Sequence, residues 1–343
     1  MKTLDRLVPF FSQYEDFAFV DIRWLPYVVF FNRGDYVSPA LNTDSAGFRV
    51  SHGPEGPRSL QDAPPDGEVS VLLGSSLAFG LGASADERTI ASLLGREPGG
   101  PTWLNLASPA FTSTQEAVLF LLHRHQLPAV RDVVVLSGVN NLVVAGLPEA
   151  DSNYGQFFWS GDFMRKMGVP EQEEPQWTLG RLGAATRRIR QRRKAPDGAA
   201  APRILSLEER VDLAVRTTVR DLARVCELAA PTGARVHFVL QPTLAWCGKR
   251  LSPEETALIE ENDRERKHMW DLFNEVLNGP VYPSYGKRLE RACDELRVPF
   301  VDANRALASS SAIDDWLFVD PVHLNDEGNR VVTEILEAEL DIS

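Results

Sequence analysis

The sequence predicts an α/β protein with a parallel, doubly wound sheet, and three observations predict it. Short β-branched runs alternate along the chain with longer amphipathic segments, an order typical of parallel sheets. Two of the runs, VSVLL and DVVVL, are almost continuously apolar, as expected of strands covered on both faces. Between residues 207 and 229 apolar side chains recur every three or four residues, which indicates a helix with one buried face. The expected strands are Val69–Leu73, Thr102–Leu106, Asp132–Leu136, Arg235–Leu240 and Pro299–Asp302.

The helices fall between these strands in the order that such a sheet requires. Val69–Leu73 ends at a glycine, and a helix is expected over Glu87–Leu94 before the second strand. Gln115–His125 is expected to join the second and third strands as a helix. Leu207–Ala229 precedes the fourth strand, and Glu327–Leu340 forms the last helix. Ligands of such sheets bind at the carboxyl ends of the strands, so chemically useful residues are expected just after them.

The chain is expected to hold one catalytic domain over residues 68–343, preceded by an N-terminal extension over residues 1–67. The Pro and Gly residues from 53 to 67 indicate a loop before the first strand. An insertion at about 148–205 interrupts the domain, and it carries aromatic side chains and then seven basic residues from Arg181 to Lys194. It is interpreted as a solvated helix followed by a mobile loop. The alternative is a lid whose basic face receives a phosphate, such as the pantetheine arm of a carrier protein or coenzyme A.

Composition and charge exclude several classes of protein. Of the 343 residues 43% are hydrophobic, and the net charge of −12 argues against nucleic acid and anionic membranes as partners. No apolar run approaches the roughly 18 residues of a membrane span, and acidic residues near the N-terminus argue against a signal peptide, so we expect a cytoplasmic protein. Cys226, Cys247 and Cys293 are widely spaced and match no metal-ligand pattern. We therefore expect no disulfide framework, metal or cofactor.

Four short motifs follow predicted strands or lie near the C-terminus. Gly74-Ser75-Ser76 follows the first strand, ASPAFTSTQ the second and SGVNN, which ends in Asn140 and Asn141, the third. DPVHLNDEGN lies near the C-terminus. Each is ordinary by itself, because Gly-Ser-Ser is usually a turn, an asparagine after a strand usually caps a helix, and Asp-Pro-x-His usually forms a turn.

Together these motifs contain the groups that acyl transfer at a serine requires. A serine hydroxyl is too weakly acidic to attack a carbonyl unaided, and an imidazole has a pKa near the working pH. His323 supplies the imidazole, and Asp320, three residues before it, supplies the acceptor that fixes its tautomer. The oxyanion needs fixed donors, which an asparagine amide and backbone N–H groups provide.

The motifs resemble the sequence blocks of the SGNH (GDSL-type) hydrolases. The first block of that family reads G-D-S with a glycine four residues after the serine, and Gly74, Ser75, Ser76 and Gly80 match this spacing. The resemblance therefore places the nucleophile at Ser76. It implies a three-layer α/β/α, flavodoxin-like fold over about residues 69–147 and 233–340, with an N-terminal extension and a lid-like insertion added to it.

The remaining blocks imply the rest of the site. Asn105 matches the asparagine of the second block, and Ala110 stands where the family has its oxyanion glycine. The third block, G-x-N-D, is matched by GVNN at 138–141, which makes the Asn140 amide an oxyanion donor beside the backbone N–H groups of Ser76 and Ala110. The D-x-x-H block implies that Asp320 and His323 complete the triad.

The chain is most similar to a bacterial branch of the family in which an N-x-x-G-F-R element precedes the nucleophile block. The stretch from Asn42 to Arg49 is a version that is one residue longer. Proteins of that branch often act on sugars or secondary metabolites.

Three positions depart from the family pattern. Ser75 and Asn141 replace acidic residues, and these replacements are expected to change how the nucleophile turn is held. Ala110 keeps its backbone N–H, but alanine does not adopt the backbone angles that only glycine reaches. A narrower or reshaped oxyanion hole is therefore expected.

The residues imply a serine-dependent acyl hydrolase, an esterase or thioesterase, that forms an acyl-enzyme on Ser76. Trp246, just after the fourth strand, and Asn141 are candidate substrate-binding residues. The first alternative is an acyltransferase that passes the acyl group to an alcohol or amine in secondary-metabolite or sugar modification. The second is a catalytically silent binding protein. The expected partner is a small acyl ester or thioester, with a carrier protein or coenzyme A as the alternative source of the acyl group.

Overall fold

A five-stranded parallel sheet forms the centre of the protein. The computed structural model describes residues 3–19, 22–63, 67–152, 155–166, 203–265 and 267–342. The strands lie in the order β6-β5-β7-β8-β9, and every neighbouring pair is parallel. Their bounds are β5 Glu68–Gly74, β6 Thr102–Asn105, β7 Ala129–Ser137, β8 Arg235–Leu240 and β9 Phe300–Asp302. This is the flavodoxin-like strand order, so the predicted fold class is confirmed.

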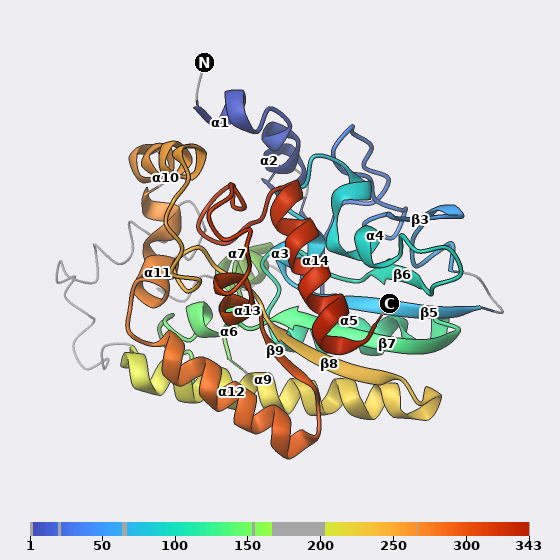
Figure 1. Ribbon diagram of the computed structural model, residues 1–343. Coiled ribbons are helices and arrows are strands. Elements are labelled where there is room, and N and C mark those ends of the chain that lie inside the picture. Colours follow the sequence, from blue (N-terminus) through green and yellow to red (C-terminus); the bar gives the residue numbers. More distant parts are fainter. Residues whose placement is uncertain are drawn as a thin grey trace.

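Helices cover both faces of the sheet and make three layers (Figure 1). Side chains alternate along each strand, so Val71 and Leu73 of β5 face one apolar core while Leu72 faces the other. The helices packed on the first core are α5 (Ser113–His123), α9 (Leu207–Ala229) and α12 (Tyr282–Leu296). Those packed on the second are α4 (Ile90–Leu94), α13 (Ala303–Ala308) and α14 (Asp326–Leu340).

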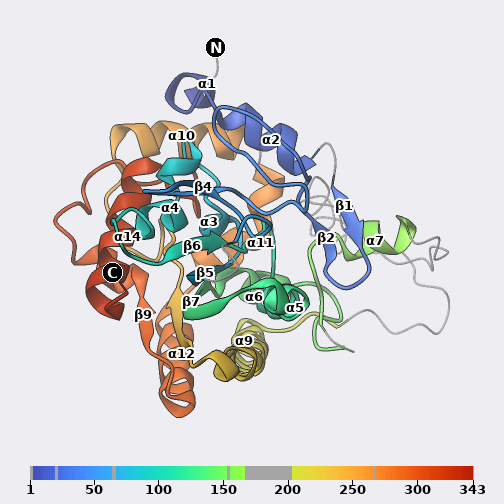
Figure 2. The same ribbon diagram turned by 90° about the vertical axis from the view of Figure 1, so that its right-hand side faces the viewer.

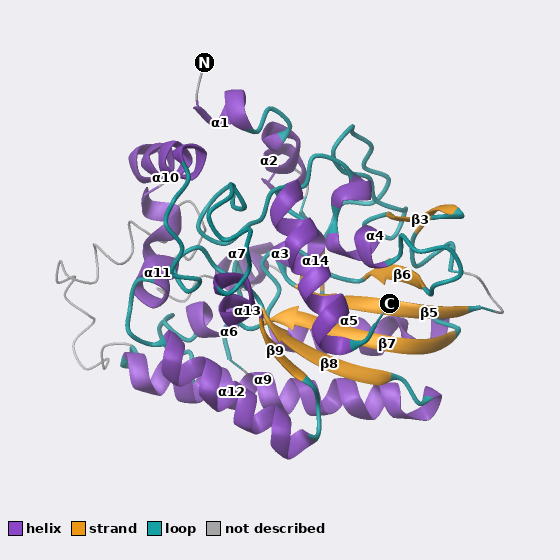
Figure 3. Ribbon diagram, in the orientation of Figure 1, coloured by secondary structure: helices purple, strands orange, loops and turns teal. Residues whose placement is uncertain are grey.

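The carboxyl ends of the strands meet at one edge of the sheet. The helices that follow β5, β7 and β9 begin there, and Figure 3 shows the strand arrows pointing towards them. These helices are α3 (Ser76–Phe79), α6 (Val139–Val144) and α13. Parallel strands thus bring segments that are far apart in the sequence to one place.

The N-terminal residues pack against the rest of the chain. They form α1 (Thr3–Leu7), α2 (Phe11–Phe19) and two antiparallel hairpins, β1 (Arg23–Leu25) with β2 (Val29–Phe31) and β3 (Ser51–Gly53) with β4 (Gly56–Arg58). Tyr14 and Phe17 of α2 belong to the same core as Leu72 of β5. Helix α1 lies against α10 (Pro253–Glu265), and Figure 2 shows these helices together at one end of the molecule.

Two groups of helices differ from the sequence prediction. The helix predicted over Glu87–Leu94 is divided into a 3-10 turn, Asp86–Arg88, and α4, because Thr89 is extended and its hydroxyl accepts the Ser92 N–H as an N-cap. The segment between β8 and β9 holds α10, α11 (Lys267–Leu277) and α12, which were not predicted. The predicted lid is described only in part, with α7 at Ser160–Lys166, and its basic stretch lies outside the described residues.

Candidate active site

Ser76 begins a one-turn helix directly after β5. Gly74 has φ +153°, and a Cβ there would lie 2.2 Å from the Leu136 carbonyl oxygen, so only glycine fits. Ser75 follows in an extended conformation, is buried, and donates its hydroxyl to Gln241 Oε1 at 3.2 Å. Ser76 is the first residue of α3 and is partly exposed. Of the two serines, Ser76 is therefore the one that a ligand can reach.

A continuous series of hydrogen bonds joins Ser76 to His323 and Asp320. Ser76 Oγ lies 2.7 Å from His323 Nε2, and His323 Nδ1 lies 2.6 Å from Asp320 Oδ2. Asp320 Oδ1 accepts the backbone N–H groups of Val322 and His323, both at 2.9 Å, which fixes the carboxylate. When Nδ1–H donates to this carboxylate, Nε2 is left as an acceptor for the serine proton.

A buried ion pair holds the loop that carries Asp320 and His323. Glu255 on α10 accepts the backbone N–H groups of Leu317 and Phe318 through Oε1, at 3.0 and 3.1 Å. Its other oxygen pairs with Lys249, and neither side chain is exposed. Lys249 also donates to the Asp315 carbonyl at 2.8 Å. The contact between Glu255 and this loop does not follow from the sequence, because 62 residues separate Glu255 from the N–H of Leu317.

The structure places Ala110 and Asn140 in the turns on either side of the Ser76 turn. Ser108, in the turn after β6, donates its N–H to the Gly74 carbonyl at 3.2 Å. Asn140, in α6 after β7, donates from Nδ2 to the Phe111 carbonyl at 2.8 Å. Strands β6 and β7 flank β5, so both turns begin beside Gly74, the last residue of that strand. The bond to Phe111 fixes the Asn140 amide and uses one of its two N–H groups.

Ala110 adopts a backbone conformation that is usual for glycine. Its φ is +61°, in the left-handed region. For an alanine the left-handed conformation costs about 1–2 kcal/mol relative to the right-handed one. Ala110 thus forms a left-handed turn of the kind that glycine usually forms, and its methyl group is present in that turn.

Asn141 and Trp246, the two candidate substrate-binding residues, are both buried in contacts with other side chains. Asn141 is buried, its Oδ1 accepts the Ser113 N–H at 3.0 Å, and its Nδ2 donates to the hydroxyls of Ser113 and Thr218 at 2.6 and 2.7 Å. These bonds join α6 to α5 and α9 and use the whole amide. Trp246 is also buried and stacks on Tyr282, with ring centroids 5.1 Å apart.

A buried carboxyl group lies behind the turn that leads to Asn140. Glu116 on α5 is 1% exposed, and its Oε1 accepts the Ser137 hydroxyl at 2.6 Å. Its Oε2 is buried without a hydrogen-bond partner in the described part of the chain. Burial raises the pKa of Glu116 to about 8. Nothing in the sequence around QEAVLF distinguishes this carboxyl group from an exposed one.

Cys247 and His237 take no part in the hydrogen-bond series from Ser76 to Asp320. Burial raises the pKa of Cys247 to about 12, so this thiol is protonated at neutral pH. His237 lies in β8 beside Asp132, with Nε2 3.0 Å from Oδ1. The described residues contain no cluster of three or more side chains arranged to bind a metal ion. Among the helices within the described ranges, none has the length and apolar character needed to cross a membrane.

No protein-family model matches the sequence, and no curated protein matches it either. Solved structures do match. A member of the lipolytic G-D-S-L family from Veillonella parvula is 11% identical, with a TM-score of 0.41 and coverage of 80% of this chain and 98% of that one. An extracellular lipase from Streptomyces rimosus is 13% identical, with a TM-score of 0.39 and coverage of 80% and 99%.

A third match is the salicylyl-acyltransferase SsfX3 from a tetracycline biosynthetic pathway, which is 14% identical. Its TM-score is 0.40, and the match covers 81% of this chain and 56% of that one.

Proposed function

We propose that this chain is a serine-dependent acyl hydrolase, an esterase or thioesterase, that forms an acyl-enzyme on Ser76. The observation that carries the proposal is the hydrogen-bond series from Ser76 Oγ through His323 to Asp320, with separations of 2.7 and 2.6 Å. His323 is 8% exposed and Asp320 is 5% exposed. Nucleophilic catalysis needs an accessible serine, a base hydrogen-bonded to its hydroxyl and a carboxylate that orients the base, and these three groups provide them.

In the proposed reaction His323 Nε2 takes the Ser76 proton as Oγ attacks the acyl carbonyl. Asp320 stabilises the imidazolium that forms. The oxyanion accepts hydrogen bonds from the backbone N–H groups of Ser76 and Ala110 and from the Asn140 amide. His323 then donates the proton to the leaving alcohol or thiol as the acyl bond to it breaks. Water then attacks the acyl carbonyl while His323 takes its proton. The bond between the acyl group and Ser76 Oγ breaks, the acid leaves, and His323 returns the proton to Oγ.

Aromatic side chains near the triad support an apolar acyl or alcohol group in the substrate. A series of ring contacts begins at His323, whose ring centroid lies 6.5 Å from that of Trp270, and ends at Phe111, whose carbonyl binds Asn140. The rings between Trp270 and Phe111 are Phe273, Phe158, Trp159 and Phe30, with neighbouring centroids between 4.6 and 6.4 Å apart. These rings come from α11, the segment before α7, and β2. A screen of acetyl, octanoyl and benzoyl esters and thioesters tests this, and a preference for acetyl would contradict it.

The same surroundings favour acyl transfer as the second candidate. His323 is buried beside the ring of Trp270, which limits the access of water, so an alcohol or amine acceptor competes well for the acyl-enzyme. The two reactions are separated by adding candidate acceptors to an ester assay and measuring acid and transfer product together. Transfer product in excess of acid at millimolar acceptor would favour the acyltransferase.

A fluorophosphonate probe tests the nucleophile directly. We expect labelling of Ser76 with loss of fluoride, and no labelling of Ser76→Ala. The matched control is Ser75→Ala, the neighbouring serine whose hydroxyl binds Gln241, and it should still be labelled. Folded protein that stays unlabelled would favour the catalytically silent binding protein instead.

A further inference from the structure

The helical turn that begins at Ser76 depends on contacts from outside itself. Helix α3 has only four residues, and a single turn is not stable alone. Its last carbonyl groups have no partners within the helix and need donors from elsewhere. Asn105 of β6 supplies one donor, since its Nδ2 lies 3.0 Å from the Ala78 carbonyl oxygen. Arg49, on the N-terminal extension, supplies the donors for the carbonyl groups of Phe79 and of Gly80, the residue that ends the helix.

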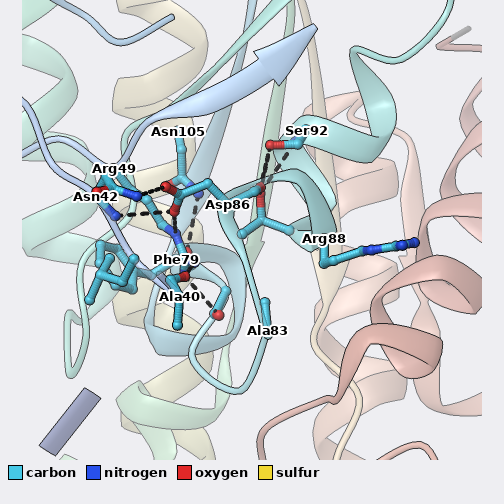
Figure 4. Close-up of polar contacts among 12 residues, drawn as sticks. Ala40, Asn42, Arg49, Phe79, Ala83, Asp86, Arg88, Ser92 and Asn105 are labelled. Atoms are coloured by element: carbon cyan, nitrogen blue, oxygen red, sulfur yellow. Dashed lines mark hydrogen bonds and ion pairs between the residues drawn. The ribbon is translucent and has the colours of Figure 1, made fainter. Parts of the chain in front are cut away.

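Arg49 uses all five of its N–H groups and is fully buried, with 0% exposure. Nη1 donates to the carbonyl oxygens of Phe79 and Gly80 at 3.1 and 2.9 Å. Nη2 donates to the Ala40 carbonyl at 2.7 Å and to the Tyr14 hydroxyl at 3.1 Å, and Nε donates to Asp86 at 2.9 Å. Figure 4 shows the guanidinium between Ala40, Phe79 and Asp86.

Gly80 connects Arg49 to Ser76, because it is hydrogen-bonded to both residues. Gly80 N–H donates to the Ser76 carbonyl at 3.1 Å, while the Gly80 carbonyl accepts from Arg49. Gly80 has φ +91°, and a Cβ there would lie 2.6 Å from Thr89 Cγ2 and 3.1 Å from Arg49 Nη1. The glycine four residues after Ser76 thus allows both the left-handed turn and the close approach of the guanidinium. The positive charge of the guanidinium also interacts favourably with the partial negative charge at the C-terminal end of α3.

Asp86 and Asn42 hold the guanidinium in place from the other side. Asp86 Oδ1 accepts from Arg49 Nε, and Oδ2 accepts from Asn42 Nδ2 at 2.7 Å. Asp86 lies in the 3-10 turn before α4, and both its side-chain partners belong to the stretch NTDSAGFR. The two ends of that motif therefore meet at one carboxylate, which orients the arginine towards α3 (Figure 4).

We propose that Arg49 is a positioning residue for the nucleophile: by binding the carbonyl groups at the end of α3 it fixes Ser76 Oγ in line with His323 Nε2. This inference rests on the proposed function and adds that the N-terminal extension completes the active site. Arg49 touches neither Ser76 nor His323, and its effect is exerted through the backbone of α3. Displacement of a reacting group by about 1 Å lowers rates by about 100-fold, which sets the expected effect of its loss.

The test compares Arg49→Lys with Arg235→Lys by their rates of fluorophosphonate labelling at Ser76. Lysine carries its donors on one atom and cannot reproduce the fork that Arg49 presents. Arg235 is the matched control, because it also donates Nε to a buried aspartate, Asp132, but at the amino end of β8. Each rate constant is measured well below the melting temperature of that variant and per folded molecule. We expect a loss of about 100-fold for Arg49→Lys and less than about threefold for Arg235→Lys.

Steady-state kinetics separate positioning from stability alone. With any ester that the wild type hydrolyses, Arg49→Lys should lower kcat and leave KM within about threefold, because Arg49 makes no contact with substrate. A lower melting temperature with unchanged labelling and unchanged kcat would overturn the inference while the proposed function stands. Wild-type protein that is not labelled at Ser76 would overturn both.

A milder variant keeps the test informative if Arg49→Lys does not fold. Tyr14→Phe removes a hydroxyl that accepts from Arg49 Nη2 and lies 3.2 Å from the Gly80 carbonyl oxygen and 2.6 Å from that of Ala83. The variant therefore loosens both the guanidinium and the end of α3, while the bonds from Arg49 to Phe79 and Gly80 remain. We expect its labelling rate to fall by about 3- to 10-fold, less than for Arg49→Lys, in proportion to the smaller disturbance. A labelling rate equal to that of the wild type would contradict the inference.

Discussion

Glu116 offers a prediction whose sign and size both follow from the structure. Its carboxyl group is fully buried, one of its oxygens has no partner in the described part of the chain, and burial raises its pKa to about 8 from an ordinary value of 4.5. Between these values the folded protein keeps a proton that the unfolded chain has lost. The free energy of unfolding therefore falls as the pH rises through this window.

The expected magnitude is large for a single side chain. Each pH unit changes the free energy of unfolding by about 1.36 kcal/mol, so the window of about 3.5 units corresponds to about 5 kcal/mol. Glu116→Gln removes the titration and keeps an oxygen that accepts the Ser137 hydroxyl. The new amide N–H₂ group has no acceptor among the described residues, which lowers stability by about 1–3 kcal/mol at every pH. The variant should thus be less stable than the wild type at pH 5 and more stable near pH 8.5.

Urea unfolding at half-unit steps from pH 5 to 8.5 measures this difference. The difference in free energy of unfolding between variant and wild type should change sign within the range. Glu227→Gln, on an exposed part of α9, controls for the replacement of a carboxylate by an amide and should run parallel to the wild type. Parallel curves for Glu116→Gln and the wild type would refute the assignment of a raised pKa to this group.

Three further predictions concern Asn140, Ala110 and Cys247. Asn140→Ala should lower turnover by about 100- to 1000-fold, because it removes one oxyanion donor, and an ester assay with folded variant checks this; a change below threefold would exclude the amide from the oxyanion hole. Ala110→Gly should change the free energy of unfolding by less than about 1 kcal/mol, since relief of the left-handed alanine offsets the greater freedom of glycine in the unfolded chain, and it should keep fluorophosphonate labelling within about tenfold. Cys247 should resist iodoacetamide at pH 8 in the native protein, because burial holds its pKa near 12, and rapid labelling of this residue detected by mass spectrometry would show that the segment opens.

The sheet and the residues of the proposed triad could be selected from the sequence because their signals are local. Apolar runs such as VVVL identify strands by themselves, and parallel strands then place whatever follows them at one edge. Ser76 and His323 are 247 residues apart, yet the strand–turn pattern brings them to hydrogen-bonding distance. Short motifs supplied the serine, histidine and aspartate, and the spacing of the G-D-S block selected Ser76 rather than Ser75 for the proposed triad.

The supporting contacts had no comparable signal. Arg49 binds Asp86 from 37 residues away, and Glu255 binds the loop before Asp320 from 62 residues away, so neither pairing follows from spacing. Helix α10, with the sequence PEETALIEENDRE, has few apolar side chains, so its buried face is hard to recognise by periodicity. Asn141 stands in the same motif as Asn140, but its amide joins helices, a difference that depends on Ser113 and Thr218.

Because every N–H group of Arg49 is already hydrogen-bonded, we expect warming or denaturant to abolish the proposed activity in an all-or-none manner. Every N–H of the guanidinium already has an acceptor, so no alternative arrangement of the turn keeps all of these bonds. We expect the turn to be either formed or lost in each molecule. Warming or mild denaturant should then reduce the fraction of competent molecules while each competent molecule keeps its rate. In a pre-steady-state experiment the amplitude of the acylation burst would fall, and its rate constant would follow only the ordinary temperature dependence.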